Sequence, residues 1–313
     1  MSATSVETGY AVVAVDGTEE GDAAVAFAAR EASREGLALR LVHVMPAWVP
    51  VGPLLMIVAD EGRPALGAYA SESLASAARV AADLAPELEI TTELLLGSRV
   101  SEVVRFAEHA QFIAVGRRPA SALDRAWSGG TMDGIVSRAR CPVHVVPHVS
   151  RADGPPRVVA AYKSADHAPE LLEAAFRAAD ELGSELEIVH AWKLSTGYDD
   201  MIASRVSEAR WNRDQKDEIR DVLAAWQKRY THVPVRIRVV HEYPVRAIVE
   251  ASREADRLVL VKPLHGAFVH HLGRTARGVL RFAQCPVDVE PARNPDEPTG
   301  PAIAIEREGA LVP

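Results

Sequence analysis

The second half of this sequence repeats the first, element by element. The segment around His43 (LRLVHVM) recurs around His190 (LEIVHAW), 147 residues later, and a Cys-Pro-Val motif at Cys141 recurs at Cys285, 144 residues later. Any two α/β domains share a rhythm of strands and helices, but they do not place the same residue types at a nearly constant offset in separate elements. We conclude that two copies of one domain lie in tandem.

The boundary between the copies falls in residues 148–156, which are polar, contain proline and glycine, and show no hydrophobic periodicity. Such a composition is typical of a linker. We therefore predict a first domain over residues 1–150 and a second over residues 151–291. Residues 292–313 are rich in Pro, Glu and Gly, and we expect them to form a disordered tail.

Short apolar runs alternate with longer helical segments in each copy. Continuous β-branched runs of this length are typical of strands buried on both faces of a parallel sheet, and the alternation implies helical crossovers. We predict two tandem α/β domains, each a doubly wound five-stranded parallel sheet. The strands expected in the first copy are Tyr10–Asp16, Leu39–Met45, Glu87–Leu96, Phe112–Gly116 and Pro142–Pro147, with helices at 19–34, from Pro64 to 84, 100–110 and 129–139.

Composition excludes several classes of protein. The chain is 48% hydrophobic and 25% charged, with a net charge of -8, which argues against nucleic acid or an anionic membrane as a partner. No apolar run approaches the roughly 20 residues of a membrane span, and residues 1–8 lack the basic and apolar regions of a signal peptide. Two cysteines in equivalent places are expected to be buried, unpaired thiols. We predict a cytoplasmic protein.

The motifs taken in order resemble the universal stress protein family in its tandem form. They are VVAVDGT at the first strand, LRLVHV at the second, Gly116 after the fourth, a glycine-bearing loop that leads into a helix at Gly129, and the Cys-Pro-Val-x-Val ending at Cys141. The resemblance covers most of residues 9–290. It implies the fold of the adenine nucleotide alpha hydrolase-like proteins and, in some members, binding of ATP.

The family's nucleotide motif is Gly, two residues, Gly, nine residues, Gly, then Ser or Thr. Glycines let backbone N–H groups approach phosphate oxygens, and the hydroxyl and the helix N-terminus add donors. Carried over, Asp16 matches an acid that contacts the adenosine end, while Pro119 and Gly130 depart from the motif. The residues assigned to this site are Asp16, Gly17, Thr18, Val44, Gly116, Arg117, Ser128, Gly129, Gly130 and Thr131.

The second copy departs further from the motif. We interpret Tyr162 as the replacement for the acid and Lys262 as the replacement for the first glycine, with Gly273 and Arg274 at the Gly-Ser position. The expectation is therefore ATP or another adenine nucleotide in the first domain, and no cofactor in the second.

Other interpretations stay open at this point. Asp16 could equally help to cap the following helix, and a helix cap is the simpler role for residues 128–131. A basic cluster at Lys262, His265, His270, His271 and Arg274 is interpreted as a solvated loop, because no metal-ligand spacing accompanies it.

The sequence contains no catalytic motif, so we expect a binding module and not an enzyme. A ligand-independent scaffold is the second hypothesis and a weak ATP hydrolase the third. The last strands, Pro142–Pro147 and Pro286–Glu290, are expected to pair the two domains within the chain, and a homodimer is also expected.

Overall fold

The computed structural model describes residues 9–46, 56–118, 130–148, 154–194, 200–201, 207–262 and 272–292. The predicted tail, including its apolar piece at 302–305, lies outside these residues. The first half contains β1 (Tyr10–Ala14), α1 (Glu19–Glu35), β2 (Ala38–Met45), α2 (Met56–Leu84), β3 (Ile90–Leu96), α3 (Arg99–Phe106), β4 (Phe112–Arg117), α4 (Gly130–Arg138) and β5 (Val143–Pro147).

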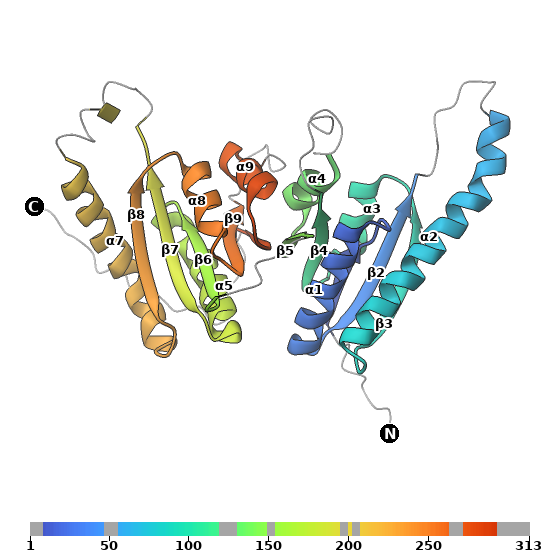
Figure 1. Cartoon of the computed structure of the whole chain (residues 1–313), viewed down its shortest axis with the longest axis horizontal. Helices are drawn as coiled ribbons and strands as arrows, with labels where there is room; N and C mark the ends of the chain where they lie inside the picture. The colour runs from blue at the N-terminus through green and yellow to red at the C-terminus, as the bar shows by residue number, and fades with distance from the viewer. Residues whose placement is uncertain are drawn as a thin grey trace, which may run out of the picture.

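The second half repeats this order (Figure 1). Its elements are β6 (Arg157–Tyr162), the short 3-10 helix η2 (Ala165–His167), α5 (Ala168–Leu182), β7 (Glu185–Trp192), α7 (Glu208–Arg229), β8 (Val235–His241), α8 (Pro244–Ser252), β9 (Arg257–Lys262), α9 (Arg274–Phe282) and β10 (Val287–Pro291).

The described strands form one sheet in the order β3-β2-β1-β4-β5-β10-β9-β6-β7-β8. Within each half the neighbouring strands are parallel, and both halves use the same internal order. β5 and β10 join the halves as an antiparallel pair. The two tandem, doubly wound parallel sheets predicted from the sequence are confirmed, and so is their pairing through the last strands within the chain.

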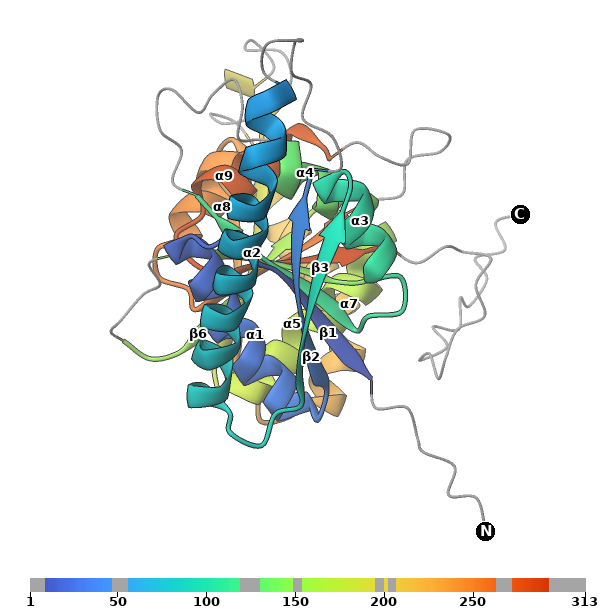
Figure 2. The same ribbon diagram turned by 90° about the vertical axis from the view of Figure 1, so that its right-hand side faces the viewer.

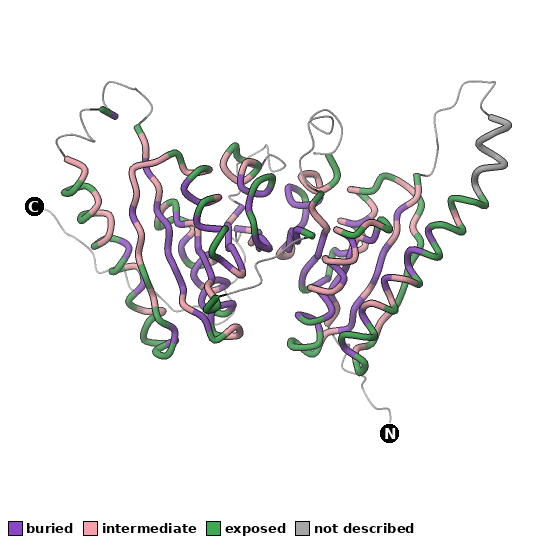
Figure 3. The backbone as a smooth tube through the Cα atoms, viewed as in Figure 1, coloured by how far each residue is buried: buried purple, intermediate pink, exposed green. Residues whose placement is uncertain are grey.

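Helices cover both faces of this sheet (Figures 2 and 3). In the first half α1 and α2 bury one face of the strands, with Val25 and Leu41 in a shared apolar cluster. In the second half α5 and α7 bury the corresponding face around Phe176. On the opposite face one apolar cluster runs across both halves, from Val103 on α3 to Leu280 on α9. The two domains therefore share a core.

Helix α1 shows how local sequence sets these boundaries. The Thr18 hydroxyl oxygen accepts a hydrogen bond from the Gly21 N–H at 3.2 Å, so Thr18 is the N-cap of the helix. Glu19, Glu20 and Asp22 lie in the first turn, where the helix dipole favours acids. Gly36 ends the helix at φ 66°, a left-handed conformation that favours glycine.

Helix α2 differs from the expectation. It begins at Met56 and not after Pro64, so the proline lies inside the helix. A proline removes one backbone donor and disfavours the turn before it, but it does not prevent helical residues on either side. The helix therefore starts earlier in the sequence than we predicted from the position of Pro64.

A pseudo-twofold axis relates the two domains and passes through the β5–β10 pair. In that pair His144 lies opposite Asp288, and these two residues are counterparts in the repeat, 144 positions apart. The His144 Nδ1 and Asp288 Oδ1 atoms are 2.6 Å apart, and both side chains are buried. The two repeats thus meet through a hydrogen-bonded ion pair on the axis.

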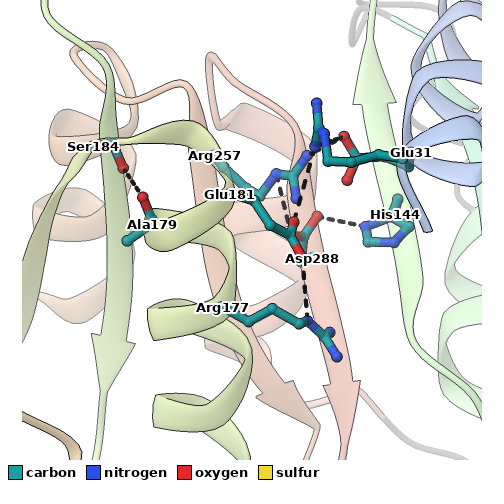
Figure 4. A network of polar contacts seen from close by, with 9 residues as sticks. Glu31, His144, Arg177, Ala179, Glu181, Ser184, Arg257 and Asp288 are labelled. Atoms are coloured by element: carbon teal, nitrogen blue, oxygen red, sulfur yellow. Dashed lines mark hydrogen bonds and ion pairs between the residues drawn. The ribbon is translucent and has the colours of Figure 1, made fainter. Parts of the chain in front are cut away.

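Arg257 extends this ion pair into a buried network (Figure 4). Its guanidinium lies 2.8 Å from the Glu31 carboxylate on α1 and 3.5 Å from the Asp288 carboxylate. Nearby, Arg34 on α1 lies 3.9 Å from Glu181 on α5. Buried charges are tolerated only when they are paired in this way. The network therefore connects α1, β5, α5, β9 and β10 across the domain boundary.

The charged groups in the network shift the pKa values of one another. Burial alone lowers the pKa of His144, but the Asp288 carboxylate outweighs burial and raises it. Burial raises the pKa of Asp288, whereas the charges of His144 and Arg257 outweigh it, so the net shift is downward. The pair is therefore held in its charged form at the centre of the protein.

A second set of contacts crosses the boundary at the carboxyl ends of β4 and β9. Lys262 is buried, and its Nζ donates to the backbone carbonyls of Val136, Ser137 and Ala139 at the end of α4, at 2.8–3.2 Å. In the reverse direction the Arg117 guanidinium donates to the Leu280 carbonyl on α9 at 3.2 Å. Each domain thus caps a helix of the other.

Both cysteines are free thiols, as expected. Each lies in the turn before the last strand of its repeat, where Cys285 is buried and Cys141 is half-buried. Among the described residues, no helix is both long enough and apolar enough to cross a membrane.

Candidate functional site

A cleft of about 980 Å³ opens at the carboxyl ends of β1, β2 and β4 in the first domain. In open α/β sheets this edge is where ligands bind. Helices α2, α3 and α4 contribute residues to its walls, and so does α9 of the second domain. The cleft is therefore bounded by both repeats.

Asp16 stands just beyond the end of β1, with its side chain exposed in the cleft. Its Oδ1 accepts hydrogen bonds from the Thr18 N–H at 3.2 Å and the Thr18 hydroxyl at 2.6 Å. Its Oδ2 lies 4.0 Å from the Arg118 guanidinium. One carboxylate oxygen thus orients the helix cap while the other faces the cleft, so the two roles considered for Asp16 are compatible.

Two glycines near Asp16 are required by close contacts. Gly17 has φ 73°, and a Cβ atom there would lie 2.5 Å from the Tyr69 hydroxyl. A Cβ atom on Gly116 would lie 2.4 Å from the Glu20 carbonyl oxygen in the first turn of α1. Gly116 therefore allows β4 to approach the α1 N-terminus, which is a structural reason for a glycine at this position.

One wall of the cleft is aromatic and apolar. The rings of His43 on β2 and Tyr69 on α2 meet edge to face, 6.4 Å apart, and the Tyr69 hydroxyl donates to the Asp16 carbonyl at 3.3 Å. Val44 and Leu66 line the same region. Burial, followed by the charge of Arg99, lowers the pKa of His43, which favours the neutral ring. This wall suits a flat heterocycle next to a polar group.

The lining of the cleft carries net positive charge. This lining includes two acids, Asp16 and Asp133, and a larger number of arginines. The arginines are Arg99, Arg117, Arg118, Arg277 and Arg281. Burial raises the pKa of Asp133, while the charges of Arg277 and Arg281 lower it. Guanidinium groups present planar sets of donors to phosphates and carboxylates. The electrostatics therefore favour an anionic ligand.

The structure brings together part of the predicted site. Asp16, Val44, Gly116, Arg117 and Thr131 line the cleft, whereas Gly17 and Thr18 lie behind Asp16 at the start of α1. Gly130 is the first residue of α4. The remaining predicted residues, Ser128 and Gly129, lie outside the described residues, as does Pro119.

Strand register corrects two assignments in the second copy. The pairing of β1 with β2 and of β6 with β7 makes Tyr162 the counterpart of Val15, so Lys163 stands at the position of Asp16. The pairing of β4 with β5 and of β9 with β10 makes Lys262 the counterpart of Arg117, and Val261 stands at the position of Gly116. The alignment of the two copies made from the sequence was therefore shifted by one residue at the ends of β6 and β9.

The corrected positions still differ in chemistry from the first domain. A cation replaces the acid, and a branched side chain replaces the glycine. Tyr162 is buried, and its ring packs against His190, while Trp192 packs against Trp211 of α7 and against His241. Aromatic side chains therefore fill the region of the second domain that corresponds to the first-domain cleft.

Tyr69, Arg99, Arg277 and Arg281 were missed as site residues by sequence reasoning. Tyr69 and Arg99 lie on elements that the family motif does not include, and the other two belong to the second domain. A basic run without any acid in Arg274–Phe282 was the one available signal. Within the described residues no group of three or more metal-ligating side chains occurs; the histidines at 265, 270 and 271 lie outside them.

Comparisons with known proteins agree with this fold. The model of the universal stress protein family matches residues 11–147 and again residues 156–289. A universal stress protein of Mycobacterium tuberculosis is 31% identical over 330 residues, covering 96% of this chain and 100% of that protein.

Solved structures show the same architecture. A universal stress protein from Archaeoglobus fulgidus superimposes with a TM-score of 0.67 at 21% identity, covering 93% of this chain and 98% of its own. Another solved structure is a universal stress protein in complex with cAMP, with a TM-score of 0.35 and 19% identity, covering 46% of this chain and 99% of its own.

Proposed function

This chain belongs to the universal stress protein family, and we propose that it is a regulatory stress-response module that binds an adenine nucleotide in the first domain. The observation that carries the proposal is the composition of the first-domain cleft. It combines an acid at the end of β1, an aromatic wall at His43 and Tyr69, and several arginines. These groups match a ribose hydroxyl, a base and a phosphate, respectively.

We propose that the second domain binds no nucleotide in the family manner. Lys163 cannot accept a hydrogen bond from a ribose hydroxyl, because an ammonium group has donors only. Lys262 is engaged with the carbonyls at the end of α4. The second domain then serves the fold and the first-domain cleft, and calorimetry is expected to give one nucleotide per chain.

Replacing Asp16 tests the proposed site. We expect Asp16→Asn to weaken AMP and ATP binding about tenfold, a change of about 1.4 kcal/mol. The neutral amide is a weaker acceptor than the carboxylate for a hydrogen bond from a ribose hydroxyl. The amide oxygen can still accept from Thr18, so the α1 cap is retained. Isothermal titration calorimetry gives the dissociation constants.

The exposed Glu93 on β3 offers the control, since Glu93→Gln makes the same chemical change far from the cleft. Equal dissociation constants for wild type and Asp16→Asn would show that Asp16 only caps the helix. An absence of binding by the wild type at millimolar nucleotide would exclude the nucleotide function itself.

We propose binding without turnover. ATP hydrolysis requires a positioned water and a base, and neither the motifs of the sequence nor the cleft geometry supports that assignment. Phosphate release from ATP should be no faster with the protein than without it. A rate that rises with protein concentration and falls in Asp16→Asn would favour the hydrolase instead.

A ligand-independent scaffold is the second candidate. The observation in its favour is that β5 and β10 are joined by a shared core and a buried ion-pair network, which needs no ligand. Since these strands already pair within the chain, the proposed homodimer would use another surface. Light scattering measures that oligomeric state, and copurified nucleotide would argue against the pure scaffold.

A further inference from the structure

We infer that helix α9 of the second domain completes the ligand site of the first, with Arg277 and Arg281 binding the phosphate chain of a nucleoside polyphosphate. The inference rests on the proposed function and extends it. It makes the site a property of the paired domains, and it makes the number of phosphates the basis of selectivity.

The two arginines are placed together by helix geometry. They are four residues apart on α9, so they lie on the same face one turn from each other. Both line the cleft. Gly278 and Phe282, the next residue after each, line it as well. One face of α9 therefore forms part of the cleft wall, next to the end of β4, where Arg117 contacts the helix.

The position of α9 is fixed by contacts on its other sides. Arg117, at the end of β4, donates to the Leu280 carbonyl, and Leu280 itself is fully buried in the core shared by both domains. Gly278 packs closely on α8, since a Cβ atom there would lie 2.8 Å from Val245. Figure 1 shows α4 and α9 facing each other at the middle of the molecule. The arginines are thus presented to the cleft by a well-packed helix.

In the described part of the chain neither Arg277 nor Arg281 forms an ion pair, and the Arg281 guanidinium lies 5.6 Å from the centroid of the neighbouring Phe282 ring. Other exposed arginines, such as Arg220 and Arg253, pair with acids three residues away on their own helices. Helix α9 contains no acid at all. Asp133 on α4 is the nearby carboxylate, and its burial raises its pKa and so opposes ionisation. The cleft thus retains positive charge for a ligand.

The placement of charge predicts which ligands bind best. Asp16 and the aromatic wall belong to the first domain and would hold the nucleoside, whereas Arg277 and Arg281 belong to the second domain. A phosphate chain that extends from the nucleoside toward α9 gains a charge-assisted contact with each added phosphate. Adenosine gains none. Affinity should therefore rise from adenosine through AMP and ADP to ATP.

The test compares Arg277→Gln/Arg281→Gln with wild type in the full chain. Calorimetry at fixed ionic strength gives dissociation constants for adenosine, AMP, ADP and ATP. We expect the variant to bind ATP at least about tenfold more weakly, as expected for two lost charge-assisted contacts, and adenosine within about twofold of wild type. Neither side chain lies in the buried core, so the variant should keep the wild-type melting temperature.

The control is Arg220→Gln/Arg253→Gln, which removes the same charge from exposed helices that do not line the cleft. Its ATP affinity should stay within about twofold of wild type. Equal ATP affinity in wild type and the α9 variant would overturn the inference while leaving nucleotide binding intact. Equal losses in both double variants would also overturn it, because the effect would then be one of net charge. If wild type binds no nucleotide, the proposed function fails and the inference fails with it.

Discussion

Arg257→Met should lower the free energy of unfolding by about 3 kcal/mol. Removing one partner from a buried ion network leaves the opposite charges without compensation, and such changes typically cost about 3–5 kcal/mol. Glu31 and Asp288 would each keep one partner, Arg34 and His144 respectively, so the lower end of that range applies. Methionine replaces the methylene stem of arginine with an apolar chain of similar length and removes the guanidinium. Urea denaturation of both proteins at the same pH measures the difference.

Arg253→Met is the matched control. It removes an arginine that pairs with Glu250 on the surface, with both side chains about 60% exposed, and should cost less than about 1 kcal/mol. A loss for Arg257→Met as small as that of the control would show that the network contributes little to the pairing of the domains.

The free energy of unfolding should fall as pH rises from 5 to 8, because the contacts at the domain boundary lose stability. Ionisation of Glu290 should be a main cause. Glu290 lies beside a cavity of about 270 Å³ at the boundary, near Asp288, His144, Arg177 and Glu35. Burial, and after it the Asp288 charge, raises the pKa of Glu290 from 4.5 to about 7. The folded protein therefore holds a proton that the unfolded chain releases above pH 4.5. The contribution of this proton to the free energy of unfolding is fully present below pH 4.5 and is lost as pH rises through about 7.

His144 acts in the same direction, because its pKa is raised above 6.5 and its contribution is lost as pH rises through the raised value. Asp288 acts in the opposite direction at the acid end. Its pKa lies below 3.8, so its contribution is present above pH 3.8 and is lost only on further acidification. The boundary should accordingly be most stable near pH 4–5.

Glu290→Gln separates these contributions, since the amide does not titrate. When the pKa of a group differs by one between the folded and unfolded protein, the free energy of unfolding changes by about 1.4 kcal/mol. The variant should therefore lose at least about 1.4 kcal/mol less stability than wild type between pH 5 and pH 8. Urea midpoints measured across this range provide the comparison, with Glu93→Gln on the exposed β3 strand as the control. Parallel curves for wild type and Glu290→Gln would show that its carboxyl is ionised throughout.

The repeat and the rhythm of strands were readable from the sequence because buried parallel strands have a distinctive composition. The offset between His43 and His190 already predicted that the second half repeats the strands of the first half in the same order along the chain. Two residue assignments in the second copy were one position off: Tyr162 was matched with Asp16, and Lys262 with Gly116. The 147-residue offset of His43 and His190 already maps Asp16 onto Lys163. For Lys262 the spacing was ambiguous, because the offset changes to 144 by Cys285, and only backbone pairing fixes which residues are side by side.

The site was predictable on one wall only. Asp16 and Gly116 belong to a motif of one domain, and local sequence reveals such motifs. Arg277 and Arg281 reach the cleft only because β5 and β10 pair and carry α9 to the first domain. That arrangement depends on the whole fold, so the basic run at Arg274–Phe282 did not by itself indicate a site in the first domain.

The pair on the pseudo-twofold axis has a consequence for assembly. In a dimer of identical chains, a residue on the axis must face its own copy, so His144 would meet His144 and Asp288 would meet Asp288. Here the counterparts have diverged to opposite charge, and the counterparts Arg34 and Glu181 have done the same. If the halves were produced as separate polypeptides, they should prefer each other over themselves, because each self-pairing brings like charges together. The surfaces through which the two halves pair thus carry complementary charges, which favours pairing of each half with the other.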